Sequence, residues 1–469
     1  MSPNTGEGLW HRFRFSSQPR LWLTLLLVVV ALGVLAPQLD PRPLTFFDGL
    51  GYFSYLPALF EGRPFDLQEF AYPPLHAQWR NYPGTGRTVN PWGVGPALSW
   101  LPWYAGARLL YPGLGPMDQL LWRSCALGTL VTALAGVVLL FWALAAVLPR
   151  WAAGAGALAG LVATPVLAYA ANVPFTSLAL SFALVSAVLW LTLTRDLGRP
   201  WVWLAMGMAC GLLAASRPQA MIFAALPLAR RRPSGGQAAL GGLGFLLLFF
   251  PQMLYWRMTF GSWLVLAQQQ SIPEFFRVPA VGSVLFSPKH GLFSTHPLLL
   301  VGAGGLVTLA LRPGWRRLGV MALGLVAVET VVNALPFDWW GGWSFGARRF
   351  CEAMPLFALG IGYAFSRLPW LTLAGVAAAW WNLALLWAWT TDIPQYQYCF
   401  QLYGRSIHPV SPLSVAVVGA VARHLATTPG LAAGTAGSLA LAGWLLARSR
   451  AGKRGAREEQ AVSPAGRQP

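Results

Sequence analysis

An aspartate at position 48 opens an aromatic stretch, TFFDGLGYFSYLPALFEG, just after the first apolar segment of the chain. This mixture of aromatic and apolar side chains is typical of a helix that lies at the headgroup level of a bilayer. A carboxylate held there can accept the proton of a substrate hydroxyl, so we interpret Asp48 as a candidate general base. Aspartate before Gly-Leu-Gly is also typical of a helix N-cap, and this structural alternative is compatible with catalysis.

Further candidate residues lie in the same loop. Asp66 and Glu69, in GRPFDLQEF, offer carboxylates to a substrate hydroxyl or to a divalent metal. Tyr52, within the aromatic stretch, is a candidate for contact with a substrate. Glu61 and His76 are interpreted as part of a solvated loop face. The residue types leave a metal requirement open and assign no other cofactor.

Four basic side chains are candidates for binding a phosphate: Arg217, Lys289, Arg348 and Arg349. Arg217 precedes Pro218 at the end of an apolar run, where an unpaired charge is costly and an anion is the expected partner. A lipid phosphate is the structural alternative to a substrate phosphate at this position.

Two short loops carry the other cations. Lys289 and His290 lie beside a Gly turn in LFSPKHGLFSTHP, and Arg348 follows Trp340 and Trp343 in WWGGWSFGARRF. Each loop precedes an apolar run that we expect to be helical. The cations then lie beside the free backbone N–H groups of a helix start, and this combination favours the binding of an anion. Anchoring in the lipid headgroups is the structural alternative for these arginines and tryptophans.

The composition shows what kind of elements must position these residues. Only 10% of the 469 residues are charged, 56% are hydrophobic and 24 are tryptophan, whereas globular proteins carry about 25% charged residues. An ordinary soluble protein is therefore excluded. The formal net charge of +18 is interpreted as a topology signal of a membrane protein rather than as a nucleic-acid surface.

The chain contains about twelve apolar runs, and a bilayer-spanning helix needs roughly 20 apolar residues. Two of the runs are short, because Arg217-Pro218 divides one long stretch. Residues 91–111 are interpreted as a helix in the membrane interface, and Glu329 as a buried acid with a structural hydrogen bond near Asn333. The runs are 21–36, 119–148, 152–171, 174–194, 201–215, 219–229, 238–256, 297–311, 318–335, 353–366, 370–390 and 430–447.

We therefore expect an all-α polytopic membrane protein with both termini in the cytoplasm, because the basic connections then follow the positive-inside rule. Residues 1–20 would be a cytoplasmic segment, 21–447 the transmembrane domain and 448–469 a disordered basic cytoplasmic tail. Most of the candidate residues fall in outer segments, above all in a large first outer loop at 37–118.

In their order along the chain, these features resemble the GT-C superfamily of multi-spanning glycosyltransferases, as in protein O-mannosyltransferases and the lipid A aminoarabinose transferase (family 39-like). The resemblance covers about residues 20 to 400. It consists of the acid in FFDGLGYFSYLP, the run NPWGVGPALSWLPWY, the Arg-Pro break, and the loops FSPKHGLF and WWGGWSFGARRF. Paired acids are absent at Asp48, and Asn90 stands where the aminoarabinose transferases have a lysine.

The resemblance implies a GT-C-like bundle in the cell (inner) membrane with its active site on the outer, periplasmic side. Asp48 would deprotonate a hydroxyl of a glycan, lipid or protein acceptor, and the four basic residues would bind the phosphate of a polyprenyl-linked sugar. The Trp/Tyr-rich loops would stack on sugar faces. A multi-spanning transporter or lipid-linked glycan flippase is the alternative, and a non-catalytic membrane scaffold is a third hypothesis.

Overall fold

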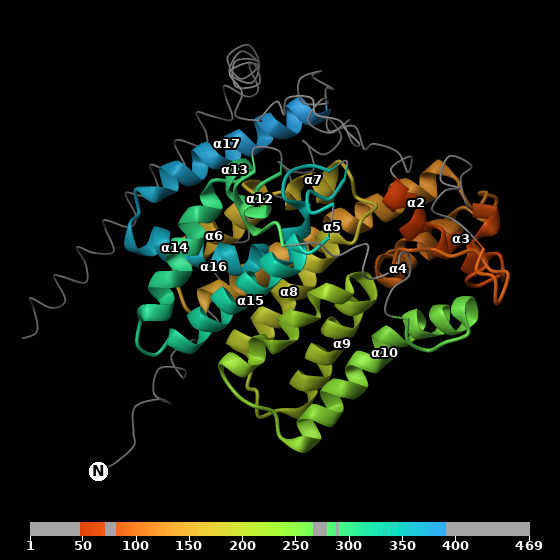
Figure 1. The fold of residues 1–469 in the computed structure, drawn as a ribbon, viewed down its shortest axis with the longest axis horizontal. Helices are drawn as coiled ribbons and strands as arrows, with labels where there is room; N and C mark the ends of the chain where they lie inside the picture. Colours follow the sequence, from red (N-terminus) through yellow and green to blue (C-terminus); the bar gives the residue numbers. More distant parts are fainter. Residues whose placement is uncertain are drawn as a thin grey trace, which may run out of the picture. The chain divides into compact units, whose positions relative to one another are not determined.

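The fold described here is that of a computed structural model, which describes residues 47–70, 81–265, 279–287, 290–336, 338–342 and 344–390. The chain divides into two compact units, Met1–Pro41 and Arg42–Pro469, and every described residue belongs to the second. Within these ranges all named elements are helical, apart from an isolated bridge between Asn81 and Thr88 (Figure 1). The expected all-α class is confirmed.

The helices follow the apolar runs of the sequence. They are α2 (Phe47–Phe53), α3 (Tyr55–Phe60), η1 (Gln68–Phe70), α4 (Gly95–Leu110), α5 (Gln119–Ala145), α6 (Arg150–Val162), α7 (Val166–Ala171), α8 (Leu178–Thr194), α9 (Pro200–Ser216), η3 (Pro218–Ala229), α10 (Gly235–Phe260), α12 (Val281–Phe286), α13 (Leu292–Thr295), α14 (Leu298–Leu311), α15 (Arg316–Ala334), η4 (Arg348–Ala353), α16 (Met354–Arg367) and α17 (Leu371–Thr390).

Among the described residues, α5, α10 and α15 are long and apolar enough to cross a membrane, with mean hydropathies of 2.2, 1.6 and 1.5. Shorter apolar helices are α8, α9, η3, α14 and the first part of α17. The chain is thus helical with the character of a membrane protein. The expected first and last apolar runs, 21–36 and 430–447, lie outside the described residues, as do the tail and residues 1–20.

Two expected runs are interrupted. The Arg217-Pro218 break separates α9 from η3, as the sequence analysis expects. The run 152–171, expected as one helix, is instead broken into α6 and α7 at Thr164-Pro165, because proline has no N–H and disfavours helical backbone in the residue before it. Within residues 91–111, Gly95–Leu110 form α4, which starts with a proline in its first turn.

Local signals fix the ends of the long helices. Asp118 caps α5 by accepting a hydrogen bond from the backbone N–H of Leu120 at 2.8 Å. Ser234 and Gln237 form a capping box at the start of α10, which ends at Gly261 in the left-handed region.

Close packing through glycine holds the bundle together. α10 lies alongside α9, and α14 lies alongside α16 (Figure 1). A Cβ at Gly207 would approach the carbonyl oxygen of Gly241 to 2.0 Å, and one at Gly305 would approach that of Gly360 to 1.9 Å. Only glycine permits these approaches, which are typical of helix packing in membranes. The two contacts lie near the middle of α9 and of α16.

Candidate functional site

The site is built around Asp48, which lies in the first turn of α2. Its Oδ1 accepts a hydrogen bond from the indole Nε1 of Trp92 at 3.2 Å, and its Oδ2 accepts one from Nη1 of Arg348 at 2.8 Å. The aspartate and the arginine are 300 residues apart in sequence. Because each carboxylate oxygen has a tertiary partner, Asp48 joins α2 both to the segment before α4 and to the loop before α16.

The glycine three residues after Asp48, Gly51, allows Trp92 to reach the aspartate. A Cβ at Gly51 would lie 2.1 Å from the indole ring of Trp92, so the ring packs directly on the backbone of α2. Asn90 holds the two segments together. Its Oδ1 accepts a hydrogen bond from the backbone N–H of Trp92 at 3.0 Å, and its Nδ2 donates one to the backbone carbonyl of Gly51 at 2.8 Å. The hydroxyl of Tyr55 donates to the Trp92 carbonyl at 2.6 Å. Gly51, the second glycine of the Gly-Leu-Gly sequence, therefore serves tertiary packing.

Arg348 begins η4 after a glycine-rich turn. Gly341, Gly342 and Gly346 all have positive φ, between 55° and 79°, a conformation that glycine adopts without strain. The hydroxyl of Tyr169 accepts from the Phe345 N–H at 2.8 Å. A ring nitrogen of His290, Nδ1, lies 3.1 Å from the Gly346 carbonyl oxygen. The loop that carries Arg348 is thus anchored by side chains from α7 and from the segment before α13.

A second ion pair lies deeper in the protein. Nε of Arg217 donates to Oε1 of Glu352 at 2.8 Å, and the two side chains are 11% and 1% exposed. Glu329 on α15 interacts electrostatically with both, and neither of its carboxyl oxygens has a hydrogen-bond partner among the described residues. Asn333, expected beside Glu329, instead donates to the Arg349 carbonyl at 3.0 Å. The structural hydrogen bond expected for Glu329 is therefore not found.

A third ion pair joins Arg349 to the glycine-rich turn: its Nη2 donates to Oδ2 of Asp338 at 2.9 Å. The side chains of Arg349 and Asp338 are 19% and 30% exposed, close to the 22% and 32% of Arg348 and Asp48. Both pairs therefore remain accessible to a small anion, whereas the Arg217–Glu352 pair is enclosed.

The surroundings favour defined protonation states. Burial raises the pKa of Tyr52, and the charge of Asp48 raises it further, so the phenol stays protonated. Tyr52 and Ser177 are hydrogen-bonded through their hydroxyls at 3.2 Å. Burial lowers the pKa of Arg348, but the charge of Asp48, its hydrogen bond to the guanidinium and the nearby phenols of Tyr169 and Tyr52 together raise the pKa by more, so the net pKa is raised. Burial raises the pKa of Glu352, and Arg217 offsets part of that rise.

The structure brings Asp48, Tyr52 and Arg348 together, and Arg217 interacts electrostatically with Tyr52. Trp340 lies in the turn beside Gly341, and its ring makes an edge contact with Trp339 at 5.8 Å between centroids.

Two candidate acids lie apart from this cluster. Asp66 and Glu69 are exposed, and Glu69 forms an ion pair with Arg63. Lys289 and Trp343 lie outside the described residues.

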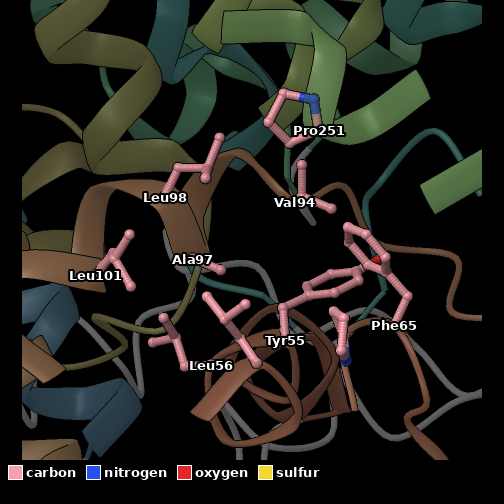
Figure 2. Close-up of a pocket in the computed structure, with 10 residues that line it drawn as sticks. Tyr55, Leu56, Phe65, Val94, Ala97, Leu98, Leu101 and Pro251 are labelled. Carbon is pink, nitrogen blue, oxygen red and sulfur yellow. The ribbon is translucent and has the colours of Figure 1, made fainter. Parts of the chain in front are cut away.

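An apolar pocket adjoins the site. Figure 2 shows it between α3 and α4, with Tyr55, Phe65, Val94 and Pro251 among the residues around it. Its volume is about 160 Å³. Tyr55 lines the pocket and donates a hydrogen bond to the backbone carbonyl of Trp92, whose indole donates to Asp48. The pocket is therefore connected to Asp48 through Tyr55 and Trp92.

No cluster of three or more metal-ligating side chains occurs among the described residues. Next to Asp48 stands a guanidinium, which repels cations and attracts anions. The chemistry that this arrangement supports is proton transfer at a carboxylate combined with stabilisation of an anion.

Sequence reasoning missed Glu352, Trp92, Asp338 and Tyr169. Glu352 had a readable signal, because an acid in an apolar run four residues after Arg348 needs a buried partner. Trp92 lies within the quoted NPWGVGP run, but nothing in its spacing shows contact with α2.

Comparison with known protein families and with curated proteins yields no match to this chain.

Proposed function

We propose that this chain is a membrane glycosyltransferase of the GT-C type, which transfers a sugar from a polyprenyl phosphate to a hydroxyl acceptor. The observation that carries the proposal is the partly exposed Asp48–Arg348 pair. It unites a proton acceptor and an anion binder at one point, with a buried phenol and an apolar pocket beside them. In this proposal the bundle has about twelve spanning helices in the inner membrane, and the site faces the periplasm.

In the proposed reaction, the donor phosphate takes the place of Asp48 as the partner of Arg348. The released carboxylate then accepts the proton of the acceptor hydroxyl while the hydroxyl oxygen forms a bond to the anomeric carbon. The bond from that carbon to the phosphate oxygen breaks, and polyprenyl phosphate leaves with the electron pair. A single displacement inverts the anomeric centre. Arg348 and Arg349 stabilise the charge that develops on the leaving phosphate.

The pairing of Arg217 with Glu352 favours a positioning role for that arginine. Arg217 is only 11% exposed and its Nε is bound to the carboxylate. Glu352 belongs to η4, the same short helix that begins with Arg348. In the proposal, Arg217 therefore holds η4 in place, and Arg348 and Arg349 contact the donor. The apolar pocket beside Tyr55 would receive the first apolar units of the donor lipid.

The decisive experiment supplies purified protein in lipid vesicles with a set of radiolabelled polyprenyl-phosphate sugars and measures consumption of each donor. Asp48→Asn keeps the shape of the side chain but removes its basicity, so we expect transfer to fall by about 10² to 10⁴. Asp66→Asn, which removes an exposed acid from the same loop, should retain activity. Arg348→Gln should weaken donor binding as well as turnover.

Three results would count against the proposal. Asp48→Asn with the rate of the unmodified protein would show that Asp48 is not the base. Movement of an intact donor across the vesicle, with no loss of its sugar, would identify a flippase or transporter. No consumption of any donor in the set would leave the sugar-transfer assignment without support.

A further inference from the structure

A further cavity, lined by two arginines, lies at the end of the bundle away from the candidate site. It is an open groove of about 710 Å³ between α14, α16 and the start of α17. Arg312 and Arg367 line it and are both exposed, and no acidic side chain is among the described residues that line it. Its remaining lining is mostly apolar or glycine, with Thr308 and Tyr363 as polar exceptions.

Chain direction separates this groove from the candidate site. α14 follows His296, which packs against Gly346, and α16 follows directly on η4. Both helices therefore start at the site and run in the same direction. Each has 14 residues, or a length of about 21 Å at 1.5 Å per residue. Arg312 is the first residue after α14, and Arg367 is the last of α16, so the arginine end of the groove lies about one helix length from the ends of α14 and α16 that start at the site.

The groove has the features of a membrane interface. Leu311 and Leu368 line it and are 77% and 48% exposed, and Trp370 next to it is 58% exposed. Exposed tryptophan with arginine at helix ends is typical of the boundary between lipid and water. Gly304 and Gly305 form part of the wall, and a Cβ added at Gly304 would meet nothing within 4 Å, so the groove is open beside this residue.

We propose that this groove binds one anionic phospholipid of the cytoplasmic leaflet, with its phosphate between Arg312 and Arg367 and an acyl chain along the α14 glycines. Two guanidinium groups with no acid in the lining select a negative headgroup, and the apolar wall selects a lipid over a free anion. This inference depends on the membrane placement of α14 and α16. It is independent of the chemistry proposed for Asp48.

Native mass spectrometry of the full chain, released from detergent with added phosphatidylglycerol, tests the proposal. The unmodified protein should retain one phosphatidylglycerol in preference to phosphatidylcholine with the same acyl chains. An arginine near a membrane surface is worth roughly fivefold in affinity for an anionic lipid, so R312Q/R367Q should bind phosphatidylglycerol about 25-fold more weakly. The matched control R316Q/R317Q removes two charges from the same end, outside the groove lining, and should bind within about twofold of the unmodified protein.

A second variant tests the groove without changing charge. Gly304 is exposed, and a Cβ added there meets nothing within 4 Å, so Gly304→Phe fills the space while the helix packing is kept. It should lose the retained lipid and keep its unfolding temperature. Equal retention by the unmodified protein, R312Q/R367Q and Gly304→Phe would overturn the proposal. Displacement of the lipid by excess inorganic phosphate would also overturn it, because it would show a simple anion site.

Discussion

The Asp48–Arg348 pair and the Arg217–Glu352 pair have the same chemistry and the same distance, 2.8 Å between charged atoms. They differ in their contact with solvent, because about a quarter to a third of each side chain is exposed in the first pair and almost none of Glu352 in the second. A partly exposed pair opens more easily, because water can solvate its charges, whereas breaking a buried pair leaves an uncompensated charge. The Asp48–Arg348 pair is therefore suited to exchange partners with a substrate, whereas the Arg217–Glu352 pair is suited to hold the structure in place.

The largest effect should come from removing one partner of the enclosed pair. We expect Glu352→Leu to destabilise the protein by about 3–5 kcal/mol, because Arg217 is left buried and without its carboxylate. Asp48→Leu, the matched change in the exposed pair, should cost at most about 1 kcal/mol. Thermal unfolding of both variants in the same detergent measures the contrast. Equal losses of stability would remove the distinction between the two pairs.

Gly51→Ala should have an intermediate effect at the exposed pair. The added methyl group would meet the indole of Trp92 at 2.1 Å, so the ring must move away from Asp48 at a cost of about 1–3 kcal/mol. Sugar transfer should fall together with the unfolding temperature. Gly106→Ala in α4, where a Cβ meets nothing within 4 Å, is the control and should stabilise by roughly 0.5–1 kcal/mol. Unchanged activity in Gly51→Ala would show that the Trp92 contact is dispensable.

The smallest effect concerns pH. Burial lowers the pKa of His296 to about 3, and its Nε2 would lie 2.4 Å from a Cβ at Gly346, in the loop that carries Arg348. In the unfolded chain His296 is protonated below about pH 6.5, whereas in the folded protein it stays neutral down to about pH 3. The free energy of unfolding therefore falls as the pH drops below about 6.5. Between about pH 7.5 and 5.5 the loss should be about 1.4 kcal/mol.

His296→Gln should reduce this pH dependence of the unfolding temperature. Its expected effect at neutral pH is small, because the neutral imidazole has no hydrogen-bond partner at either nitrogen among the described residues. An unchanged slope in this variant would assign the pH dependence to other groups.

Much of the helical framework could be predicted, because a long apolar run in a chain of low charge has few other solutions. The break at Arg217-Pro218 was predicted because these two residues divide one long apolar stretch and the distribution of basic residues favours two short helices. The break at Pro165 was missed, because its flanks are equally apolar and no charged residue marks it.

The pairings of the site were harder to predict. Asp48 and Arg348 were expected on one membrane face, but hydrophobic periodicity does not determine which cation meets which acid. Glu352 lies 135 residues from Arg217, and they become partners because η4 and η3 both pack against α8 and α15. The indole of Trp92 reaches Asp48 only because Gly51 has no side chain, a relation between two loops that no single stretch of sequence displays.

The 3-10 helix η3, which follows Arg217, spans a longer distance than an α-helix with the same number of residues would. η3 has 12 residues in the 3-10 form and rises about 2.0 Å per residue, so it extends about 24 Å where an α-helix of that length would give about 18 Å. It ends at Arg230, whose Nη1 donates to the Thr192 carbonyl at the far end of α8. The 3-10 winding thus lets the 12 residues of η3 extend about as far as the 17 residues of α8 or α9 extend in an α-helix.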